Sequence, residues 1–229
     1  MGFPLTLDLF LKRFGSLIVA EALGCLVVNR PFSMVVARDK LMSLALLSIS
    51  GIPVPPTCVT EVVTTAMDSV REWGDSVVKP ISGSLGYGSF RVSDPDVAFH
   101  VFKMLADLRQ PIYVQKYVEK PERDIRVFVV GERVIAAAYR YAPRGSWKTN
   151  VAQGGMAKPA RVAPELEELS VKAAKVLGLD YAGIDVGETA GGYVVFEANA
   201  APLWRGLQAA TGVNPAQHIA SHILSKVKR

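Results

Sequence analysis

The sequence predicts an α+β protein in which helices cover antiparallel sheets. Three observations lead to this prediction: several strand pairs are joined by short glycine-rich turns, amphipathic helices separate them, and no βαβ repeat is present. The chain has 229 residues, of which 50% are hydrophobic, so that it can bury a sizeable core in one or two domains. We therefore expect a well-packed globular protein rather than a disordered one.

The first half of the chain predicts helices around a small sheet. Gly51 suits the C-terminal cap of a helix, and Asp94 with Pro95 suits the start of another. The glycine-rich stretch 81–90, "ISGSLGYGSF", lies between two apolar runs and predicts a hairpin loop rather than the start of a helix. The expected helices are 5–23, 37–50, 64–73 and 94–109, and the expected strands are 25–29, 75–80 and 89–94.

The second half predicts a larger group of strands. A strand at 112–118 precedes a hairpin at 124–141 that turns at Gly131. A polar loop then covers 142–155, and two further strands are joined at Gly191 and Gly192. The expected helices here are 164–179 and a last one that begins at Asn214.

Charge and composition exclude some functions. The formal net charge is +5, but the sequence shows no combination of basic and aromatic residues that would form a nucleic-acid-binding surface. We therefore expect no nucleic acid partner. No apolar run is long enough to span a bilayer, so we expect no membrane association and a cytoplasmic location. Cys25 and Cys58 lie in apolar runs and suit buried free thiols in a reducing compartment. The sequence leaves open whether the protein forms a homo-oligomer.

The stretch "VVFEANAAP" (194–202) places oxygen-bearing side chains on a buried strand. Glu197 and Asn199 point to the same side because strand side chains alternate. Asp185 ends the preceding strand and can lie beside them if the two strands pair across the glycine turn. Two carboxylates and an amide oxygen suit Mg²⁺ or Mn²⁺ rather than zinc. The alternative interpretation is a strand end that passes into a polar loop.

Basic residues accompany a phosphate-type loop. Glycine-rich loops expose backbone N–H groups to phosphates, and Lys79 immediately precedes this one. The loop has neither a Walker A ending nor a Rossmann turn, so by itself it also fits a plain hairpin. Arg126 and Arg140 on the next hairpin, with Lys148 and Asn150 after it, supply polar groups that a triphosphate and its transferred group need.

In combination, these motifs resemble ATP-grasp ligases, and most closely the RimK-like branch with its α-L-glutamate ligases and LysX-type ligases. The resemblance runs from about residue 20 to the C-terminus. The motifs, in family order, are "ARDK" (37–40), "GIPVPPT" (51–57), "VVKPISGSLGYG" (77–88), "QKYVE" (115–119), "DIRVFVVG" (124–131), "WKTNVAQGG" (147–155), "GIDV" (183–186), "FEANAAP" (196–202) and "ATGVNPA" (210–216).

The resemblance implies an ATP-grasp fold, in which two α+β subdomains clasp ATP under the glycine hairpin, and one or two Mg²⁺ (or Mn²⁺) ions. Asp185, Glu197 and Asn199 match the metal ligands. Arg140, Asn150 and Arg126 are expected at the transferred group, with Arg140 steadying an acyl phosphate. The residues expected around ATP are Lys40, Lys79, Ser84, Gly86, Lys116, Tyr117, Val118, Asp124 and Lys148, where 116–118 reads adenine through its backbone and Asp124 meets the ribose.

The resemblance also divides the chain and exposes departures from the family pattern. Residues 1–36 would be the remnant of a preceding α/β domain that is mostly missing, 37–114 the lid subdomain and 115–229 the catalytic subdomain. Gln153 stands where relatives usually carry arginine, and Gln208 stands where an acidic residue is common. These two departures concern the amino-acid pocket.

We predict from this an ATP-dependent carboxylate–amine ligase that works through an acyl phosphate and adds an amino acid such as glutamate. The carboxylate partner is a small molecule or a protein, and the other substrate is an amine or amino acid. The alternatives are an ATP-grasp kinase that stops after phosphoryl transfer, and a catalytically weak nucleotide-binding regulator.

Overall fold

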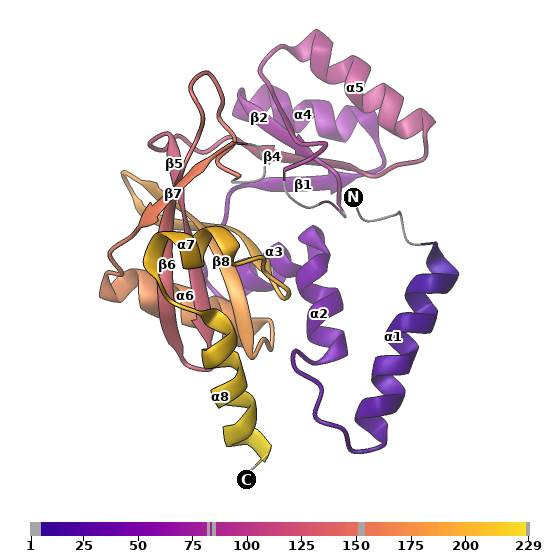
Figure 1. Ribbon diagram of the computed structural model, residues 1–229. Coiled ribbons are helices and arrows are strands. Elements are labelled where there is room, and N and C mark those ends of the chain that lie inside the picture. Colours follow the sequence, from indigo (N-terminus) through magenta and orange to yellow (C-terminus); the bar gives the residue numbers. More distant parts are fainter. Residues whose placement is uncertain (1–5, 82, 84–85, 151–153, 228–229) are drawn as a thin grey trace.

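The computed structural model describes residues 6–81, 83, 86–150 and 154–227 (Figure 1). Within them, two antiparallel sheets with their own helices form two halves, which confirms the predicted α+β class. The helices are α1 (Leu7–Ala22), α2 (Pro31–Arg38), α3 (Lys40–Ile49), α4 (Val63–Trp73), α5 (Pro95–Asp107), α6 (Pro164–Val176), α7 (Arg205–Thr211) and α8 (Pro215–Val227).

The first sheet has the order β1-β4-β2-β3, and helices α4 and α5 cover one of its faces (Figure 1). Phe102 of α5 is fully buried against strand residues such as Val78 and Val114. As predicted, Asp94 caps α5: its carboxylate accepts the backbone N–H groups of Asp96 and Val97. The strands are β1 (Thr57–Thr60), β2 (Ser76–Lys79), β3 (Phe90–Val92) and β4 (Ile112–Lys116).

The second sheet has the order β7-β6-β5-β8-β9 and buries most of the protein's core. Ile125 and Val127 of β5 lie on the face that packs against α3 and α6, where Leu47 and Leu166 are also fully buried. The intervening residues face the other way, because strand side chains alternate. The strands are β5 (Arg123–Val130), β6 (Arg133–Tyr141), β7 (Met156–Pro159), β8 (Tyr181–Thr189) and β9 (Gly192–Asn199).

The other face of the second sheet is half covered. Phe128 and Ala138 are buried beneath α7, and Trp204 meets the Phe128 ring edge-on with centroids 6.0 Å apart. Asp124 and Arg126, further along the same face of β5, lie beyond this cover and line a cleft. The same face of β5 is therefore apolar beneath α7 and polar where it lines the cleft.

Several sequence predictions need correction. The predicted strand at 25–29 is wrong, because this segment is an irregular connection. Helices α2 and α7 and strands β1 and β7 were not predicted. Cys25 and Cys58 were predicted to be buried, but Cys25 is exposed and Cys58 is partly exposed. Short apolar runs do not distinguish strands from buried connections, and the prolines before β1 conceal it. The other predicted elements are confirmed, including the α3 cap, where Gly51 has φ +72°.

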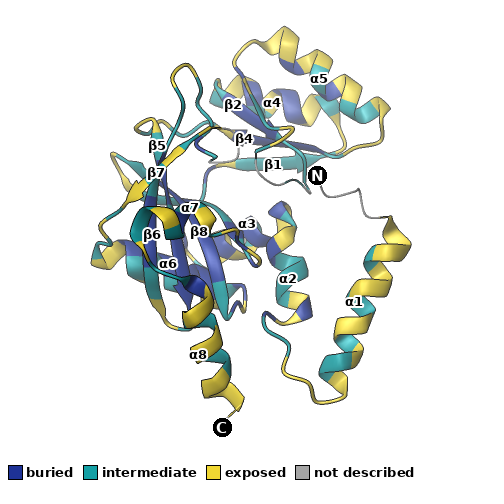
Figure 2. Cartoon of the chain, in the orientation of Figure 1, coloured by how far each residue is buried: buried dark blue, intermediate teal, exposed yellow. Residues whose placement is uncertain are grey.

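Two features bear on the predicted division of the chain. Helix α1 has no buried residue and stands apart from both sheets, as Figure 2 shows. Leu44 and Leu47 of α3 belong to the core of the second sheet. The boundaries at residues 36 and 114 stay predictions. None of the helices in the described part of the chain has the length and apolarity needed to cross a bilayer.

Candidate active site

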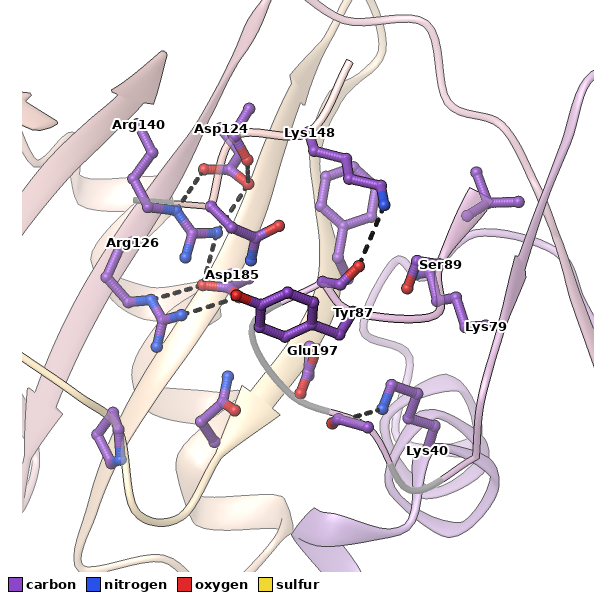
Figure 3. Close-up of a pocket in the computed structure, with 18 of the residues that line it drawn as sticks. Lys40, Lys79, Tyr87, Ser89, Asp124, Arg126, Arg140, Lys148, Asp185 and Glu197 are labelled. Carbon is purple, nitrogen blue, oxygen red and sulfur yellow. Dashed lines mark hydrogen bonds and ion pairs between the residues drawn. The ribbon is translucent and has the colours of Figure 1, made fainter. Parts of the chain in front are cut away.

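A cleft of about 840 Å³ lies between the two sheets. It receives side chains from β2, from the segment after β4, from β5, β6, β8 and β9, and from residues 147–150. Figure 3 shows lysines on one side of this cleft, with arginines and carboxylates on the floor opposite them. Most of the residues predicted from sequence for ATP, the transferred group and the metal line it.

The predicted metal ligands come together on β8 and β9. Asp185 pairs directly across the ladder with Glu197, and Gly183 pairs with Asn199. The register shifts between Asp185 and Val186, so that Phe196 is an extra residue on β9. Such a bulge re-aims neighbouring side chains, and Phe196 and Glu197 accordingly both line the cleft.

Asp185 lies between two arginines rather than open to the cleft. Its Oδ1 is 2.7 Å from Nε of Arg126 and 3.1 Å from Nη2 of Arg140. Neither contact has hydrogen-bond geometry, so this buried oxygen lacks a hydrogen bond, as does Nε of Arg126. Burial raises the pKa of the Asp185 carboxyl despite the two cations, and burial also lowers the pKa of Arg126.

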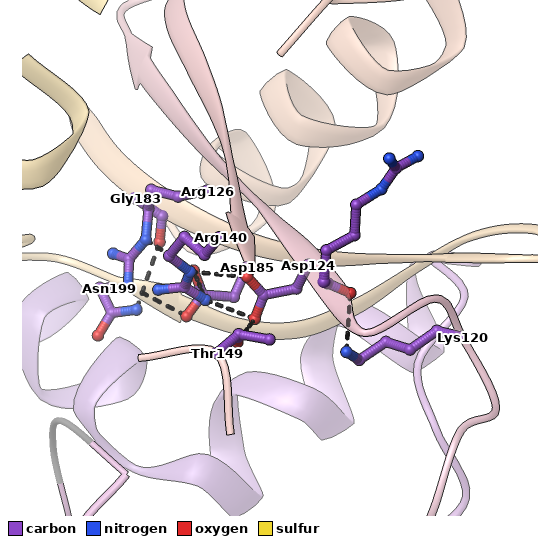
Figure 4. A network of polar contacts seen from close by, with 9 residues as sticks. Lys120, Asp124, Arg126, Arg140, Thr149, Gly183, Asp185 and Asn199 are labelled. Carbon is purple, nitrogen blue, oxygen red and sulfur yellow. Dashed lines mark hydrogen bonds and ion pairs between the residues drawn. The ribbon is translucent and has the colours of Figure 1, made fainter. Parts of the chain in front are cut away.

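Arg140 joins Asp185 to Asp124. Its Nε and Nη2 each donate to the Asp124 carboxylate at 2.7 Å, and the hydroxyl of Thr149 donates to Oδ2 of the same group (Figure 4). Burial alone would lower the pKa of Arg140, but Asp185 and Asp124 hold it above its usual value. Burial alone would raise the pKa of Asp124, and Arg140 with Thr149 holds it below its usual value. The Asp124 carboxylate is thus already engaged, and its predicted contact with ribose stays a prediction.

Lys79 is held by a buried amide. Its ammonium donates to Oε1 of Gln115 at 2.7 Å. The NH₂ group of Gln115 donates to the hydroxyls of Thr57 (2.8 Å) and Tyr113 (2.9 Å), which leaves its oxygen facing Lys79. Burial lowers the pKa of Lys79 to about 8, with Glu197 opposing this shift and Lys40 adding to it.

Two further predicted lysines, Lys40 and Lys148, contact backbone carbonyls of the glycine loop. Lys40 donates to the carbonyls of Ile81 (3.3 Å) and Gly83 (3.2 Å). Lys148 reaches the Gly86 carbonyl at 3.2 Å. Gly86 has φ +73°, which favours glycine, whereas the predicted Ser84 lies outside the described residues. Two cations from different parts of the chain therefore converge on the predicted lid.

The predicted adenine-reading segment follows β4. The backbone N–H of Lys116 donates to the Pro56 carbonyl (2.9 Å) and that of Tyr117 to the Asp75 carbonyl (2.8 Å). Both donors are therefore used within the protein. Among the described residues, Val118 is the member of the segment whose N–H has no such partner.

Of the remaining residues singled out from the sequence, some line the cleft and others do not. Asn150 lines the cleft, and its carbonyl accepts the N–H of Gly155 at 3.2 Å. Gln208 sits on α7 and does not line the cleft, and Gln153 lies outside the described residues.

No individual role was predicted for several cleft residues, even where they lie in a family motif, because their roles depend on packing. Gln115 and Thr149 orient Lys79 and Asp124, and the bulge at Phe196 has no sequence signal. Lone basic residues on loops and helices look like surface residues, and three of them line the cleft: Arg38, Lys120 and Arg205.

The oxygen donors fit a hard cation. No three acidic, histidine or cysteine side chains gather in the described parts of the chain, so the set consists of two carboxylates and one amide. The NH₂ group of Asn199 donates to the Gly183 carbonyl at 3.4 Å, which leaves the amide oxygen as the free acceptor. Glu197 and Asp185 add carboxylates that line the cleft, although Oδ1 of Asp185 is paired with Arg126 and Arg140. Such donors suit Mg²⁺ or Mn²⁺.

Comparisons with known proteins agree with this geometry. The model of the RimK-like ATP-grasp domain matches residues 37–223. A tetrahydromethanopterin:α-L-glutamate ligase of Methanosarcina acetivorans is 34% identical over 239 aligned residues, which cover 92% of this chain and 74% of the relative. A probable α-L-glutamate ligase of Thioalkalivibrio sulfidiphilus is 37% identical, with 89% and 68% covered.

Solved structures show the same fold. The ATP-grasp ligase PsnB, complexed with its precursor peptide PsnA2 and AMPPNP, is 26% identical with a TM-score of 0.77, covering 97% of this chain and 70% of PsnB. A D-alanine–D-alanine ligase from Bacillus anthracis complexed with ATP has a TM-score of 0.74 at 19% identity, covering 93% and 74%, and shows the fold alone. The family model and the curated relatives each cover most of the chain, which therefore belongs to the RimK-like ATP-grasp family.

Proposed function

We propose that this protein is an ATP-dependent ligase that joins a carboxylate to an amine through an acyl phosphate, with glutamate as the amino acid added. One observation carries the proposal: a single cleft is lined by lysines that include Lys40, Lys79 and Lys148, by the oxygen-bearing side chains of Asp185, Glu197 and Asn199, and by Arg126 and Arg140 beside Asp185. A triphosphate, a divalent cation and a developing anion need these three groups.

ATP would bind with its adenine against residues 116–118 and its phosphates below the glycine loop. Val118 has the free backbone N–H, and Trp147 closes on Tyr117 with ring centroids 6.4 Å apart. Lys40 and Lys148 would exchange the loop carbonyls for phosphate oxygens. Lys79 would likewise leave the Gln115 oxygen to donate to a phosphate oxygen. Ser84 and Gly86 stay predicted members of this lid, and Asp124 would hold Arg140 while facing the ribose side.

The arginines would serve the transferred group. The carboxylate of the substrate attacks the γ-phosphorus, ADP leaves, and an acyl phosphate forms. The amine nitrogen then attacks the acyl carbon, and inorganic phosphate and one proton leave. Arg140 and Arg126 would neutralise the acyl phosphate, and Asn150 would donate to it. Arg140 is fixed by two hydrogen bonds to Asp124, so little reorganisation is needed.

Asp185, Glu197 and Asn199 would hold Mg²⁺ or Mn²⁺, which supplies charge neutralisation at the phosphates when bound. A structural neighbour of the same fold, PsnB, was solved with Mg and ADP. Before the cation arrives, Arg126 and Arg140 offset the charge of Asp185. The same two guanidinium groups would then lie between the cation and the substrate.

Glutamate as the added amino acid rests on the names of relatives, several of which are α-L-glutamate ligases. The carboxylate partner is a small molecule or a protein. Named neighbours bind precursor peptides, and the first curated relative is named for tetrahydromethanopterin.

A screen for amine-dependent phosphate release tests the function. The protein is incubated with ATP, Mg²⁺, glutamate and a panel of carboxylates, and products are read by mass spectrometry. Ligation predicts one new amide for each ADP released, and none with Glu197→Gln. Phosphorylated product without amide would favour the kinase, and nucleotide binding without any ADP release would favour the regulator.

A further inference from the structure

Asn29 is a buried amide outside the family-matched domain. It lies in the irregular connection between α1 and α2, before residue 37, where the RimK-like match begins. Its residue surface is only 1% exposed. A buried primary amide must satisfy two N–H donors and two acceptor positions.

All four of these positions are used by backbone groups at the start of β8 and directly after β9. The NH₂ group donates to the carbonyls of Tyr181 (2.9 Å) and Ala200 (2.7 Å). The amide oxygen accepts the N–H groups of Asp180 (2.7 Å) and Tyr181 (3.1 Å). Asn29 therefore ties the beginning of one strand to the residue that follows the other.

This tie replaces a missing part of the β8–β9 ladder. The regular register ends with Gly183 opposite Asn199. Beyond it, the carbonyls of Tyr181 and Ala200 are both acceptors and cannot bond to each other, so an inserted NH₂ group joins them. The residue next to this junction is Asn199, whose own amide is turned by Gly183 so that its oxygen is free.

We infer that Asn29 is a positioning residue that fixes the Asn199 end of β9, and with it the cation site of the proposed ligase. The inference rests on the proposed function only in using that cation. It predicts that the connection before α2, which does not line the cleft, affects the affinity for Mg²⁺. Ala201 and Pro202, which line the cleft directly after the tie, depend on the same anchor.

The test compares Asn29→Ala with Ser170→Ala as a matched control. Ser170 is also fully buried, and its hydroxyl donates to the Leu166 carbonyl within α6, on the far side of the sheet. Circular dichroism and thermal unfolding report the folding of both variants. Mg²⁺ is then titrated at fixed ADP, with binding followed by tryptophan fluorescence, and ADP binding is repeated in EDTA.

We expect Asn29→Ala to raise the Mg²⁺ midpoint about tenfold and to leave ADP affinity in EDTA unchanged, because a misplaced ligand group acts only through the cation. Ser170→Ala should keep the parent midpoint whatever its loss of thermal stability. Equal midpoints for Asn29→Ala and parent, or equal shifts in both variants, would overturn the inference.

A second measurement does not depend on the folding of a variant. In ¹⁵N-labelled parent protein with ADP, addition of Mg²⁺ should shift the side-chain amide signals of Asn29, and an unchanged signal would overturn the inference. A parent that binds Mg²⁺ and ADP but forms no amide refutes the proposed function alone. A parent that binds no Mg²⁺ with ADP refutes both.

Discussion

The half-buried Lys79, at the phosphate side of the cleft, predicts an unusual dependence of nucleotide affinity on pH. Lys79 has a pKa of about 8 against 10.5 for an ordinary lysine. The difference disfavours its ammonium form by at most about 3 kcal/mol, less where the cleft admits solvent. A bound phosphate chain restores the charge, so nucleotide binding above pH 8 should take up a proton.

The signs are opposite for folding and binding. Between pH 8 and 10.5 the folded ligand-free protein loses this proton while the unfolded chain keeps it, so this group makes stability rise with pH. ADP affinity falls over the same range. With a pKa of about 8, Lys79 is about 90% protonated at pH 7 and about 10% at pH 9, which predicts about tenfold weaker binding at pH 9.

Isothermal titration calorimetry with ADP and saturating Mg²⁺ measures this directly. Runs in two buffers of different ionisation enthalpy should count close to one proton taken up at pH 9 and almost none at pH 7. Lys79→Arg is the control, because arginine stays charged and its affinity should not change between these pH values. A tenfold loss in Lys79→Arg as well would show that another group titrates, and no loss in the parent would refute the lowered pKa of Lys79.

Three further substitutions test separate parts of the site. Glu197→Gln keeps the shape of the side chain but removes one charge from the proposed cation site. Turnover should therefore fall at least about a hundredfold, while the free energy of unfolding changes by less than about 1 kcal/mol. Turnover equal to that of the parent would exclude Glu197 from the site. Thr149→Val removes a buried hydrogen bond to Asp124, which should cost about 1 kcal/mol of stability. It should also raise KM for ATP and alter the fluorescence emission of Trp147, whereas Thr149→Ser should keep the parent values of both. A serine variant that behaves like the valine variant would contradict the role given to the hydroxyl. Gly86→Val places a β-branched residue at φ +73° and should weaken ATP binding with little change in thermal stability; unchanged affinity and turnover would exclude the loop from the mechanism.

The sequence was sufficient to predict that Asp185, Glu197 and Asn199 lie together, but not what surrounds them. Strand alternation put Glu197 and Asn199 on one face, and the glycine turn brought Asp185 opposite Glu197, because these are local rules of strand geometry. The bulge that adds Phe196 depends on how β9 packs, and no residue type signals it. The same limit applied to the four-way engagement of Asp124, Arg140, Asp185 and Arg126, which joins three strands.

For the fold as well, the elements with a local sequence pattern were predictable, and those that depend on distant contacts were not. Long amphipathic helices and glycine-turned hairpins were predictable, since their periodicity extends over many residues. The connection at 25–29 has the composition of a strand, but it supplies Asn29 to a junction 152 residues away in sequence. No local pattern can predict a contact of that separation.

An isotope measurement tests the acyl phosphate most directly. The carboxylate substrate found in the screen is labelled with ¹⁸O at the group that becomes the amide, and the phosphate released with ATP and glutamate is weighed by mass spectrometry. Attack of the carboxylate on the γ-phosphorus predicts one ¹⁸O in each phosphate, because the acyl carbon gives up that oxygen when the amine attacks. Phosphate free of ¹⁸O, released together with the amide, would contradict the mechanism.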